Sequence, residues 1–275
     1  MSLSIYKKKV NDLIDIYVDK INDGKMREMI RYSLEGGKRL RSIICLYIFD
    51  NYSQCNDEIV IAVELLHNAS LILDDLPCMD NDDYRRNRLS FHKKFGVMNA
   101  YLVSNYLFCE FNKIIGNLNN ENLLKYVFEK LNLILVGQYY DLFPDTNTQN
   151  DLDKKIYNNN LKTTPFFVLS FFIPLYLCDC NISKYDIEKM AISFSTAFQI
   201  YDDFLDEKQD IESGNFSHIK YLGREYSYTL YLDNLKIFRE SIKHLKIKGD
   251  LFEEIINYLN TKLRPYLNDI QSKEA

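Results

Sequence analysis

The sequence predicts an all-α protein, folded as a single large helical bundle over residues 1–275. Hydrophobic residues make up 47% of the chain, which is enough to form an extensive core. Nine glycines and five prolines are few for this length. Apolar residues recur at helical spacing in several long stretches, and no series of alternating, strand-like segments separates them. These observations together favour helices throughout.

Helical spacing is clearest in five stretches, at residues 57–75, 99–117, 121–143, 184–206 and 247–262. We expect the loops between helices to lie in the polar segments near residues 50–57, 145–155, 179–184 and 207–218. No internal repeat and no shift in composition marks a domain boundary, so a single domain is expected.

The run PFFVLSFFIPLYLC, residues 165–178, is the most apolar part of the chain. It is shorter than the roughly 20 residues that a membrane-spanning helix needs, and Pro174 interrupts it. We therefore expect a buried core helix and no membrane span. Its four phenylalanines are interpreted as core or subunit-contact residues rather than as a prenyl pocket, namely Phe166, Phe167, Phe171 and Phe172.

Charge and cysteine content argue against a nucleic-acid-binding protein, a zinc site and a disulfide framework. The net charge of −5 leaves no basic surplus, so a nucleic-acid partner is not expected. The six cysteines show no CxxC pairing, which favours reduced thiols over a zinc site or a disulfide framework. With no signal peptide recognisable, a cytoplasmic location is expected.

The stretch LILDDLPCMDNDDYRRNR, residues 71–88, concentrates like charges at the end of an apolar run. Asp74 and Asp75 fall at the C-terminal end of the predicted helix, where the helix dipole disfavours anions. A compensating cation is therefore expected. Pro77 should end or bend the helix and let Asp80 return towards Asp74. Asp82 and Asp83 are interpreted as solvated.

A second acidic cluster lies in FQIYDDFLDE, where Gln199, Asp202 and Asp206 share one helical face. If two such helices face each other, their carboxylates form an oxygen-only ligand set, which suits Mg²⁺. Basic residues could hold the anionic ends of phosphorylated substrates. These are Lys38, Arg39 and Arg41 in GGKRLR, together with Arg85 and Arg86.

Five segments occur in an order and spacing typical of one enzyme family. They are EGGKRLR (35–41), ELLHNASLILDDLPCMDNDDYRRNR (64–88), VGQYYDL (136–142), LKTTPFF (161–167) and FQIYDDFLD (198–206). Over this region the chain resembles the trans-isoprenyl diphosphate synthases, in particular the geranylgeranyl and farnesyl diphosphate synthases. The resemblance implies a helical bundle of the isoprenoid synthase type around a central cavity, and a homodimer.

The implied reaction is Mg²⁺-dependent head-to-tail prenyl transfer, in which isopentenyl diphosphate is condensed with an allylic diphosphate. Product length in the family depends on side chains just before the first acidic motif. Here those residues are Ala69 and Ser70, which are small and favour a C20 product. Tyr106 or Phe108 on the next helix could still close the tunnel, which leaves a C15 product open.

The resemblance also implies roles for individual residues. The metal ligands would be Asp74 and Asp80, supported by Asp75, together with Asp202 and Asp206, with Asp203 nearby. The allylic diphosphate would be held by Arg85 and Lys162. Isopentenyl diphosphate would be held by Lys38, Arg41, His67 and Arg86. The reacting centre would be lined by Thr163, Gln138 and Gln199. Without the resemblance, His67 would be interpreted as a core histidine, and Lys162 would be interpreted as part of a helix start.

The chain departs from the family pattern in several places. The loop after the second acidic motif is short and lacks a first Gly-Lys pair, Asn105 stands where relatives often carry Asp, and Ser42 replaces a common proline. Gly214-Asn215 stands where relatives carry a second Gly-Lys pair, so a cation near the leaving group is missing unless Lys208 or Lys220 substitutes for it. A weakly active or non-catalytic regulatory subunit therefore stays open as an alternative. A class I terpene cyclase also uses Mg²⁺ and DDxxD, but it needs no second diphosphate site.

Overall fold

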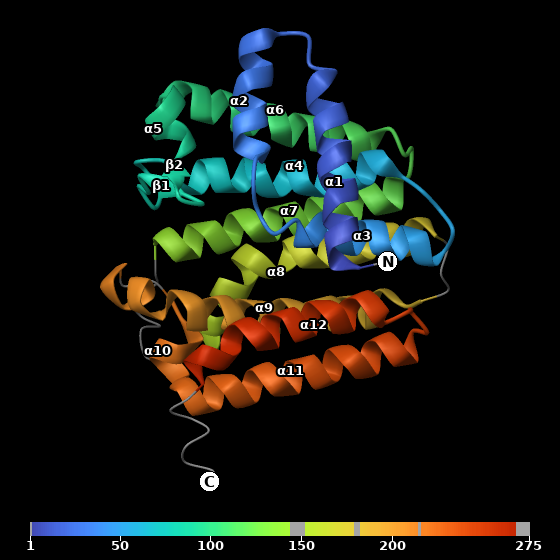
Figure 1. Cartoon of the computed structure of the whole chain (residues 1–275), viewed down its shortest axis with the longest axis vertical. Coiled ribbons are helices and arrows are strands. Elements are labelled where there is room, and N and C mark those ends of the chain that lie inside the picture. Colours follow the sequence, from blue (N-terminus) through green and yellow to red (C-terminus); the bar gives the residue numbers. More distant parts are fainter. Residues whose placement is uncertain (1, 144–151, 179–181, 214–215, 268–275) are drawn as a thin grey trace. The chain divides into compact units, whose positions relative to one another are not determined.

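Helices make up almost all of the chain that the computed structural model describes, namely residues 2–143, 152–178, 182–213 and 216–267 (Figure 1). Within these residues the only strands are β1 (Tyr84–Arg85) and β2 (Arg88–Leu89), which pair in an antiparallel hairpin. The all-α prediction is confirmed. The hairpin was not predicted, because strands of two residues are too short to produce an alternating pattern.

The helices follow one another along the chain with short connections. They are α1 (Leu3–Asp19), α2 (Gly24–Leu34), α3 (Leu40–Asn51), α4 (Asp57–Asp74), α5 (Phe91–Phe95), α6 (Val97–Gly116), α7 (Glu121–Leu142), α8 (Leu152–Leu177), α9 (Lys184–Ser213), α10 (His218–Leu222), α11 (Arg224–His244) and α12 (Asp250–Leu263), with a 3₁₀ turn η2 (Arg264–Tyr266). The predicted stretches correspond to α4, α6, α7, α9 and α12. The predicted loop over 207–218 was wrong in its first part, because EKQDIES contains no glycine or proline and continues α9.

Contacts within the chain divide it into two compact units, which are described separately below. The first comprises Met1–Tyr126 and Ile173–Asp179, and the second comprises Val127–Phe172 and Cys180–Ala275. The first acidic motif belongs to the first unit and the second motif to the second unit. Across the described residues, no helix is both long and apolar enough to cross a bilayer.

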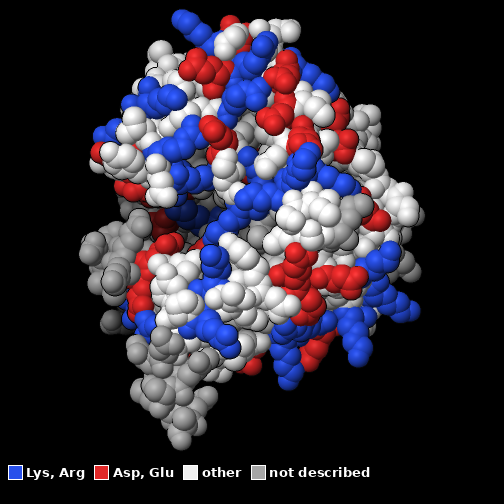
Figure 2. Space-filling model, viewed as in Figure 1, with Lys and Arg blue, Asp and Glu red and all other residues white. Residues whose placement is uncertain are grey.

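In the first unit, α4 and α6 lie side by side, and α1 and α2 run across α4 (Figure 1). The hydroxyl of Ser104 on α6 donates to the carbonyl of Ala69 on α4 at 2.8 Å, which fixes the register of these two helices. Figure 2 shows acidic and basic side chains interspersed over α1 and α2. Arg31 of α2, for example, pairs with Asp15 and Asp19 of α1 at 3.0 and 2.6 Å.

In the second unit, α9 packs along α11 and contacts α12. The rings of Phe167 and Phe171 from α8 meet Phe194 of α9 at centroid distances of 5.2 and 5.8 Å. Phe238 of α11 and Phe252 of α12 complete this fully buried cluster. Of the two interpretations of the α8 phenylalanines, core residues or subunit contacts, their burial within this chain favours the core, and the cluster anchors the helix that carries the second acidic motif.

Candidate active site

The first acidic motif begins where α4 ends. The helix stops at Asp74, and Pro77 cannot continue its hydrogen bonding. The backbone N–H of Asp80 donates to the carbonyl of Asp74 at 2.9 Å, and that of Asn81 donates to the carbonyl of Leu76 at 3.0 Å. The chain therefore turns back on itself and brings Asp80 next to Asp74, as the position of Pro77 predicted.

The second aspartate of the motif is paired with an arginine. Arg85 Nε donates to Asp75 Oδ1 at 2.8 Å, and a second N–H of the same guanidinium reaches the same oxygen. Asp75 is only 2% exposed. Burial raises the pKa of Asp75, and the Arg85 guanidinium opposes part of that rise. Asp75 therefore orients Arg85, whereas Asp74 is half-buried and Asp80 is exposed.

The hairpin β1–β2 sets the directions of two predicted diphosphate ligands. Its turn consists of Arg86 and Asn87, which have φ values of 56° and 60°. Positive φ at both central residues is the requirement of a type I′ turn, whose twist matches that of paired strands. Arg85, paired with Arg88 across the hairpin, and Arg86 at its tip are thus presented by a rigid two-residue turn.

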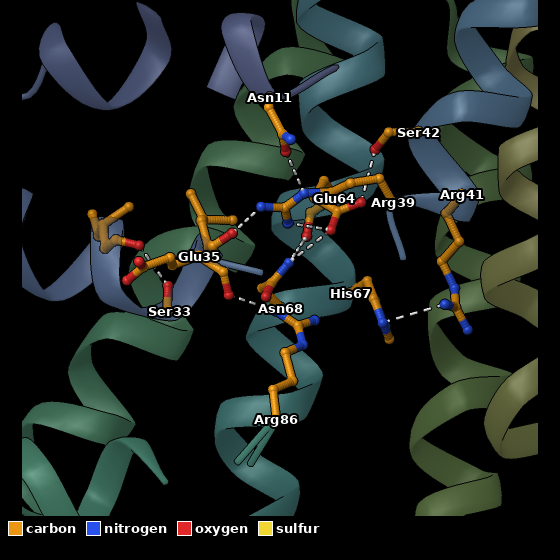
Figure 3. Close-up of polar contacts among 12 residues, drawn as sticks. Asn11, Ser33, Glu35, Arg39, Arg41, Ser42, Glu64, His67, Asn68 and Arg86 are labelled. Carbon is orange, nitrogen blue, oxygen red and sulfur yellow. Dashed lines mark hydrogen bonds and ion pairs between the residues drawn. The ribbon is translucent and has the colours of Figure 1, made fainter. Parts of the chain in front are cut away.

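Arg86 reaches across to the glycine-rich turn of EGGKRLR. Its Nη1 donates to the carbonyl of Glu35 at 3.1 Å (Figure 3). A Cβ on Gly37 would lie 2.9 Å from the guanidinium carbon of Arg86, whereas a Cβ on Gly36 would meet only Arg86 Cδ at 3.6 Å. Gly37 therefore leaves the space in which the guanidinium lies.

Gly37→Ala is expected to displace Arg86. If Arg86 holds isopentenyl diphosphate, as the resemblance implies, the KM for this substrate should rise by about 10- to 100-fold, the equivalent of one charge-assisted hydrogen bond. Gly36→Ala is the matched control, because both glycines have positive φ, at 81° and 86°, and so share the backbone cost. Steady-state kinetics with each substrate varied would measure the difference. Equal KM values for the two variants would contradict this role of Gly37.

Arg39 is not available to a substrate, so the prediction that it holds a diphosphate was wrong. The residue is 5% exposed, and its Nη1 donates to Glu64 Oε1 at 2.8 Å (Figure 3). Ser42 Oγ donates to the other oxygen, Glu64 Oε2, at 2.9 Å, and Arg39 Nε donates to Asn11 at 3.0 Å. This buried ion pair ties the glycine-rich turn to α4, so its role is structural.

Two residues predicted to hold isopentenyl diphosphate contact each other. Arg41 Nη1 lies 3.2 Å from His67 Nε2, and Figure 3 shows the two side chains facing each other. Since an arginine only donates, His67 Nε2 accepts and the ring is neutral. Burial lowers the pKa of His67 well below its usual range, and the charge of Arg41 lowers it further. Lys38, another of the four residues predicted to hold isopentenyl diphosphate, is exposed.

His67→Gln is expected to flatten the pH dependence of stability below about pH 6.5. Because the folded-state pKa lies below the unfolded value of 6.5, the unfolded chain binds more protons in this window, and the parent loses stability as pH falls. One such group contributes up to about 1.4 kcal/mol per pH unit. Urea titrations between pH 5 and 7 would give the slopes. Equal slopes in His67→Gln and the parent would contradict this prediction.

In the second unit, Gln199 of α9 is buried in a polar network with α8. Its amide nitrogen donates to Thr164 Oγ1 at 3.3 Å and to Ser195 Oγ at 3.2 Å, and its oxygen accepts from Asn159 at 3.1 Å. Thr163, predicted at the reacting centre, is half-buried, whereas the adjacent Thr164 is the residue that binds Gln199. Ser195 and Gln199 are one helical turn apart in the sequence, and this spacing is the signal from which the network could be predicted.

Lys162 is placed by an unusually close helix contact. A Cβ on Gly137 of α7 would lie 2.2 Å from the backbone nitrogen of Lys162 on α8, so only glycine fits there. Lys162 Nζ pairs with Asp141 Oδ2 at 2.6 Å, one turn further along α7. Asp141 was not predicted, although it belongs to the VGQYYDL motif. Gln138, beside Gly137, is half-buried.

In the second acidic motif, Asp202 and Asp203 are half-buried and Asp206 is exposed. Asp203 Oδ2 accepts hydrogen bonds from the backbone N–H and from Nδ1 of His218, both at 2.7 Å. His218 was not predicted. The predicted replacement of a lysine by Asn215 lies outside the described residues.

The acidic residues match the way in which Mg²⁺ is usually held. Among the described residues, no three His, Cys, Asp or Glu side chains come together closely enough to hold a metal. Mg²⁺, however, commonly binds through one or two carboxylates and takes its remaining ligands from waters and substrate phosphates. The adjacent Asp74 and Asp80 provide oxygen donors of this kind, so the residues present fit Mg²⁺.

Comparison with known proteins agrees with these features. Residues 23–215, which include both acidic motifs, match the polyprenyl synthetase family. A farnesyl diphosphate synthase of Buchnera aphidicola from Schizaphis graminum is 35% identical over 233 residues, which cover 73% of this chain and 78% of that protein. Geranylgeranyl pyrophosphate synthase 4 of Arabidopsis thaliana is 30% identical over 285 residues, covering 94% of this chain and 73% of the relative.

Solved structures show the same fold. The geranyltranstransferase of Thermotoga maritima superposes with a TM-score of 0.78 at 26% identity, over 96% of this chain and 98% of that one. The Legionella pneumophila geranyltransferase, at 22% identity, gives a TM-score of 0.80 over 94% and 96% of the two chains. The chain therefore belongs to the polyprenyl synthetase family and is a prenyltransferase.

Proposed function

We propose that the chain joins isopentenyl diphosphate head to tail to an allylic diphosphate and that its main product is geranylgeranyl diphosphate, with 20 carbons. The observation that carries the proposal is the turn in the first acidic motif, where the N–H of Asp80 binds the carbonyl of Asp74. This turn brings the backbones of Asp74 and Asp80 together in the same motif whose Asp75 orients Arg85. Grouped carboxylates beside a fixed cation suit a metal-bound diphosphate.

Four carboxylates would hold Mg²⁺, namely Asp74 and Asp80 in the first motif and Asp202 and Asp206 in the second. When bound, Mg²⁺ would neutralise the diphosphate and stabilise the charge that develops as the allylic carbon–oxygen bond breaks. The proposal requires both motifs to reach one diphosphate. A crystal structure with a non-hydrolysable allylic diphosphate and Mg²⁺ would contradict it if Asp74 and Asp202 contacted different molecules.

Arg85 and Lys162 would bind the allylic diphosphate. Each is paired with a carboxylate, Arg85 with Asp75 and Lys162 with Asp141. Such partners hold long side chains in one orientation, which reduces the ordering cost when the substrate binds. The carboxylates therefore act as positioning residues for the two cations.

Lys38, Arg41, Arg86 and His67 would bind isopentenyl diphosphate, and Thr163, Gln138 and Gln199 would line the reacting centre. The allylic carbon–oxygen bond would break first and leave an allylic cation, which the double bond of isopentenyl diphosphate then attacks to form the new carbon–carbon bond. Inorganic diphosphate leaves, and a proton is lost from the condensed product. The cations on both sides act by holding the two substrates in register and by balancing their negative charge.

Product length would be set beside Ala69 and Ser70, which are small. Ser104 binds the Ala69 carbonyl, and Phe108, one turn further along α6, shares that face. Tyr106 instead lines a cavity together with Tyr17 of α1 and Ile61 of α4. Phe108 is therefore a better candidate than Tyr106 for the residue that limits the tunnel.

Ser70→Phe is expected to shift most of the product from C20 to C15, because the ring would fill the space that the last isoprene unit needs. Ser70 is half-buried and its hydroxyl donates only to the His67 carbonyl, so the local backbone should tolerate the change. Chromatography of the dephosphorylated products would give chain length. Tyr106→Phe serves as the control, and an unchanged C20 product in Ser70→Phe would contradict this assignment.

One assay tests the proposed function as a whole. Purified protein, Mg²⁺ and labelled isopentenyl diphosphate would be incubated with C5, C10 or C15 allylic diphosphates, and the label would be followed into longer alcohols after dephosphorylation. We expect elongation that stops at C20. Absence of any longer alcohol with all three starters would rule out chain elongation by this chain alone.

A regulatory subunit is the second candidate, favoured by Asn215 at the position of a lysine. It would show no elongation alone but would change the rate or product of an active homologue.

We also propose that the chain is cytoplasmic and that it forms a homodimer. The dimer is supported by an exposed apolar stripe on α6, which consists of Val97, Met98, Tyr101 and Leu102. Light scattering should give twice the chain mass of 32.6 kDa. A monomer would contradict the dimer without affecting the proposed reaction.

A further inference from the structure

The carboxylate of Asp203 on α9 is hydrogen-bonded to His218, which lies at the start of α10. Its Oδ2 accepts from both the backbone N–H and the ring Nδ1 of His218, each at 2.7 Å. His218 is fully buried and is the first residue of α10, while Asp203 retains 15% side-chain exposure. The contact therefore connects the start of α10 to the middle of the DDxxD motif.

The ring of His218 makes this one polar contact among the described residues. Because Nδ1 faces a carboxylate oxygen, the proton is assigned to Nδ1. Nε2 is buried and has no hydrogen-bond partner in the part of the chain that the structure describes. The ring of Phe216 packs edge-on at a centroid distance of 5.2 Å and helps to fix the orientation of the imidazole. The polar function of the side chain is thus directed at Asp203.

We infer that His218 is a positioning residue for the second acidic motif. By binding Oδ2 twice, it fixes the rotamer of Asp203, so that only Oδ1 is left for a metal ion or its water. Residues that orient carboxylates near a metal typically change metal affinity or activity by about 10- to 100-fold when they are removed. The inference rests on the proposed function only in naming Mg²⁺ and diphosphate as what the motif binds.

Two substitutions of similar size separate positioning from packing. In His218→Asn the side-chain nitrogen lies where Nδ1 was, whereas in His218→Gln it lies where Nε2 was, away from Asp203. We expect His218→Gln to raise the Mg²⁺ concentration for half-maximal activity by about 10- to 100-fold and His218→Asn to stay within about threefold of the parent. Equal Mg²⁺ dependence in the two variants would overturn the inference.

His92 supplies a matched control. It is also buried, also lies on a five-residue helix, and its Nε2 likewise lacks a partner among the described residues, but its Nδ1 faces the Ser90 hydroxyl at 3.1 Å. His92→Asn and His92→Gln should lower the melting temperature without changing the half-saturating Mg²⁺ concentration. A shift as large as that of His218→Gln would show that loss of packing alone explains the effect.

Hydrogen exchange and melting temperature test the role of His218 without depending on enzyme turnover. In the metal-free full chain, Asp203→Ala should speed hydrogen exchange of the His218 amide at least tenfold, whereas Asp202→Ala should not. Mg²⁺ with inorganic diphosphate should raise the melting temperature of the parent and of His218→Asn more than that of His218→Gln. If the parent fails to elongate, these two measurements still decide the role of His218, and unchanged exchange in Asp203→Ala would overturn it.

Discussion

Asp74→Ala and Asp202→Ala are each expected to lower the rate of prenyl transfer by about 10³-fold. Each removes a carboxylate proposed to bind Mg²⁺, and loss of such charge stabilisation costs several kcal/mol in the transition state. Steady-state and single-turnover rates with saturating substrates would measure the effect. The loss should appear mainly in kcat, because the basic residues that bind isopentenyl diphosphate are unchanged.

Stability measurements distinguish a loss of metal binding from a loss of folding in the Asp74→Ala variant. Asp74 lies at the C-terminal end of α4, where the dipole disfavours an anion, and Asp75 is adjacent. Asp74→Ala should therefore leave the metal-free unfolding free energy unchanged or raise it by up to about 1 kcal/mol. Asp83→Ala is the control, because Asp83 only pairs with Lys93 at the surface, at 2.7 Å. Parent-like activity in Asp74→Ala would refute the assignment of the metal site.

Gly137→Ala is expected to destabilise the chain by about 3 kcal/mol, at the upper end for an overpacked contact. The added Cβ would lie 2.2 Å from the backbone nitrogen of Lys162 and 2.5 Å from the backbone carbon of Leu161. Backbone atoms cannot rotate away as a flexible side chain can, so α7 and α8 must separate. For a chain of this size the melting temperature should fall by about 6 to 12 °C.

The same substitution should impair the chemistry even where the protein remains folded. Separation of the helices moves Lys162 away from Asp141 and displaces Gln138, so the KM for the allylic diphosphate should rise together with a fall in kcat. Gly116→Ala, at the end of α6, is the control because a Cβ there meets nothing within 4 Å. A Gly137→Ala variant as stable as Gly116→Ala would show that the contact is looser than described.

The helices could be predicted where one face is continuously apolar. α4, α6, α7, α9 and α12 have this pattern, and their positions followed from spacing alone. α1 was not predicted, although its apolar residues recur at helical spacing. Its buried residues are Tyr6, Val10, Ile14 and Val18, which follow one another every four positions. The end of α9 was missed because a polar segment without glycine or proline can form either helix or loop, and packing against the rest of the protein determines which of the two forms.

The site could be predicted at the level of motifs but less well at the level of single residues. The return of Asp80 to Asp74 followed from Pro77, whose effect on a helix is local. Arg39 was misassigned because adjacent arginines look equivalent in a sequence, whereas one points into the core towards Glu64. His218 was not predicted, because it lies 15 residues beyond Asp203, outside the helical spacing of the motif, and only the fold brings the two side chains together.

The left-handed turn at Arg86 and Asn87 limits which substitutions evolution or design can use there. Backbone at φ of 56° and 60° excludes β-branched residues, whatever their charge. Attempts to change specificity by replacing Arg86 with threonine or valine would thus alter the hairpin geometry as well as the charge. Lysine, asparagine and glycine are the informative replacements, because they separate loss of the guanidinium from loss of the turn.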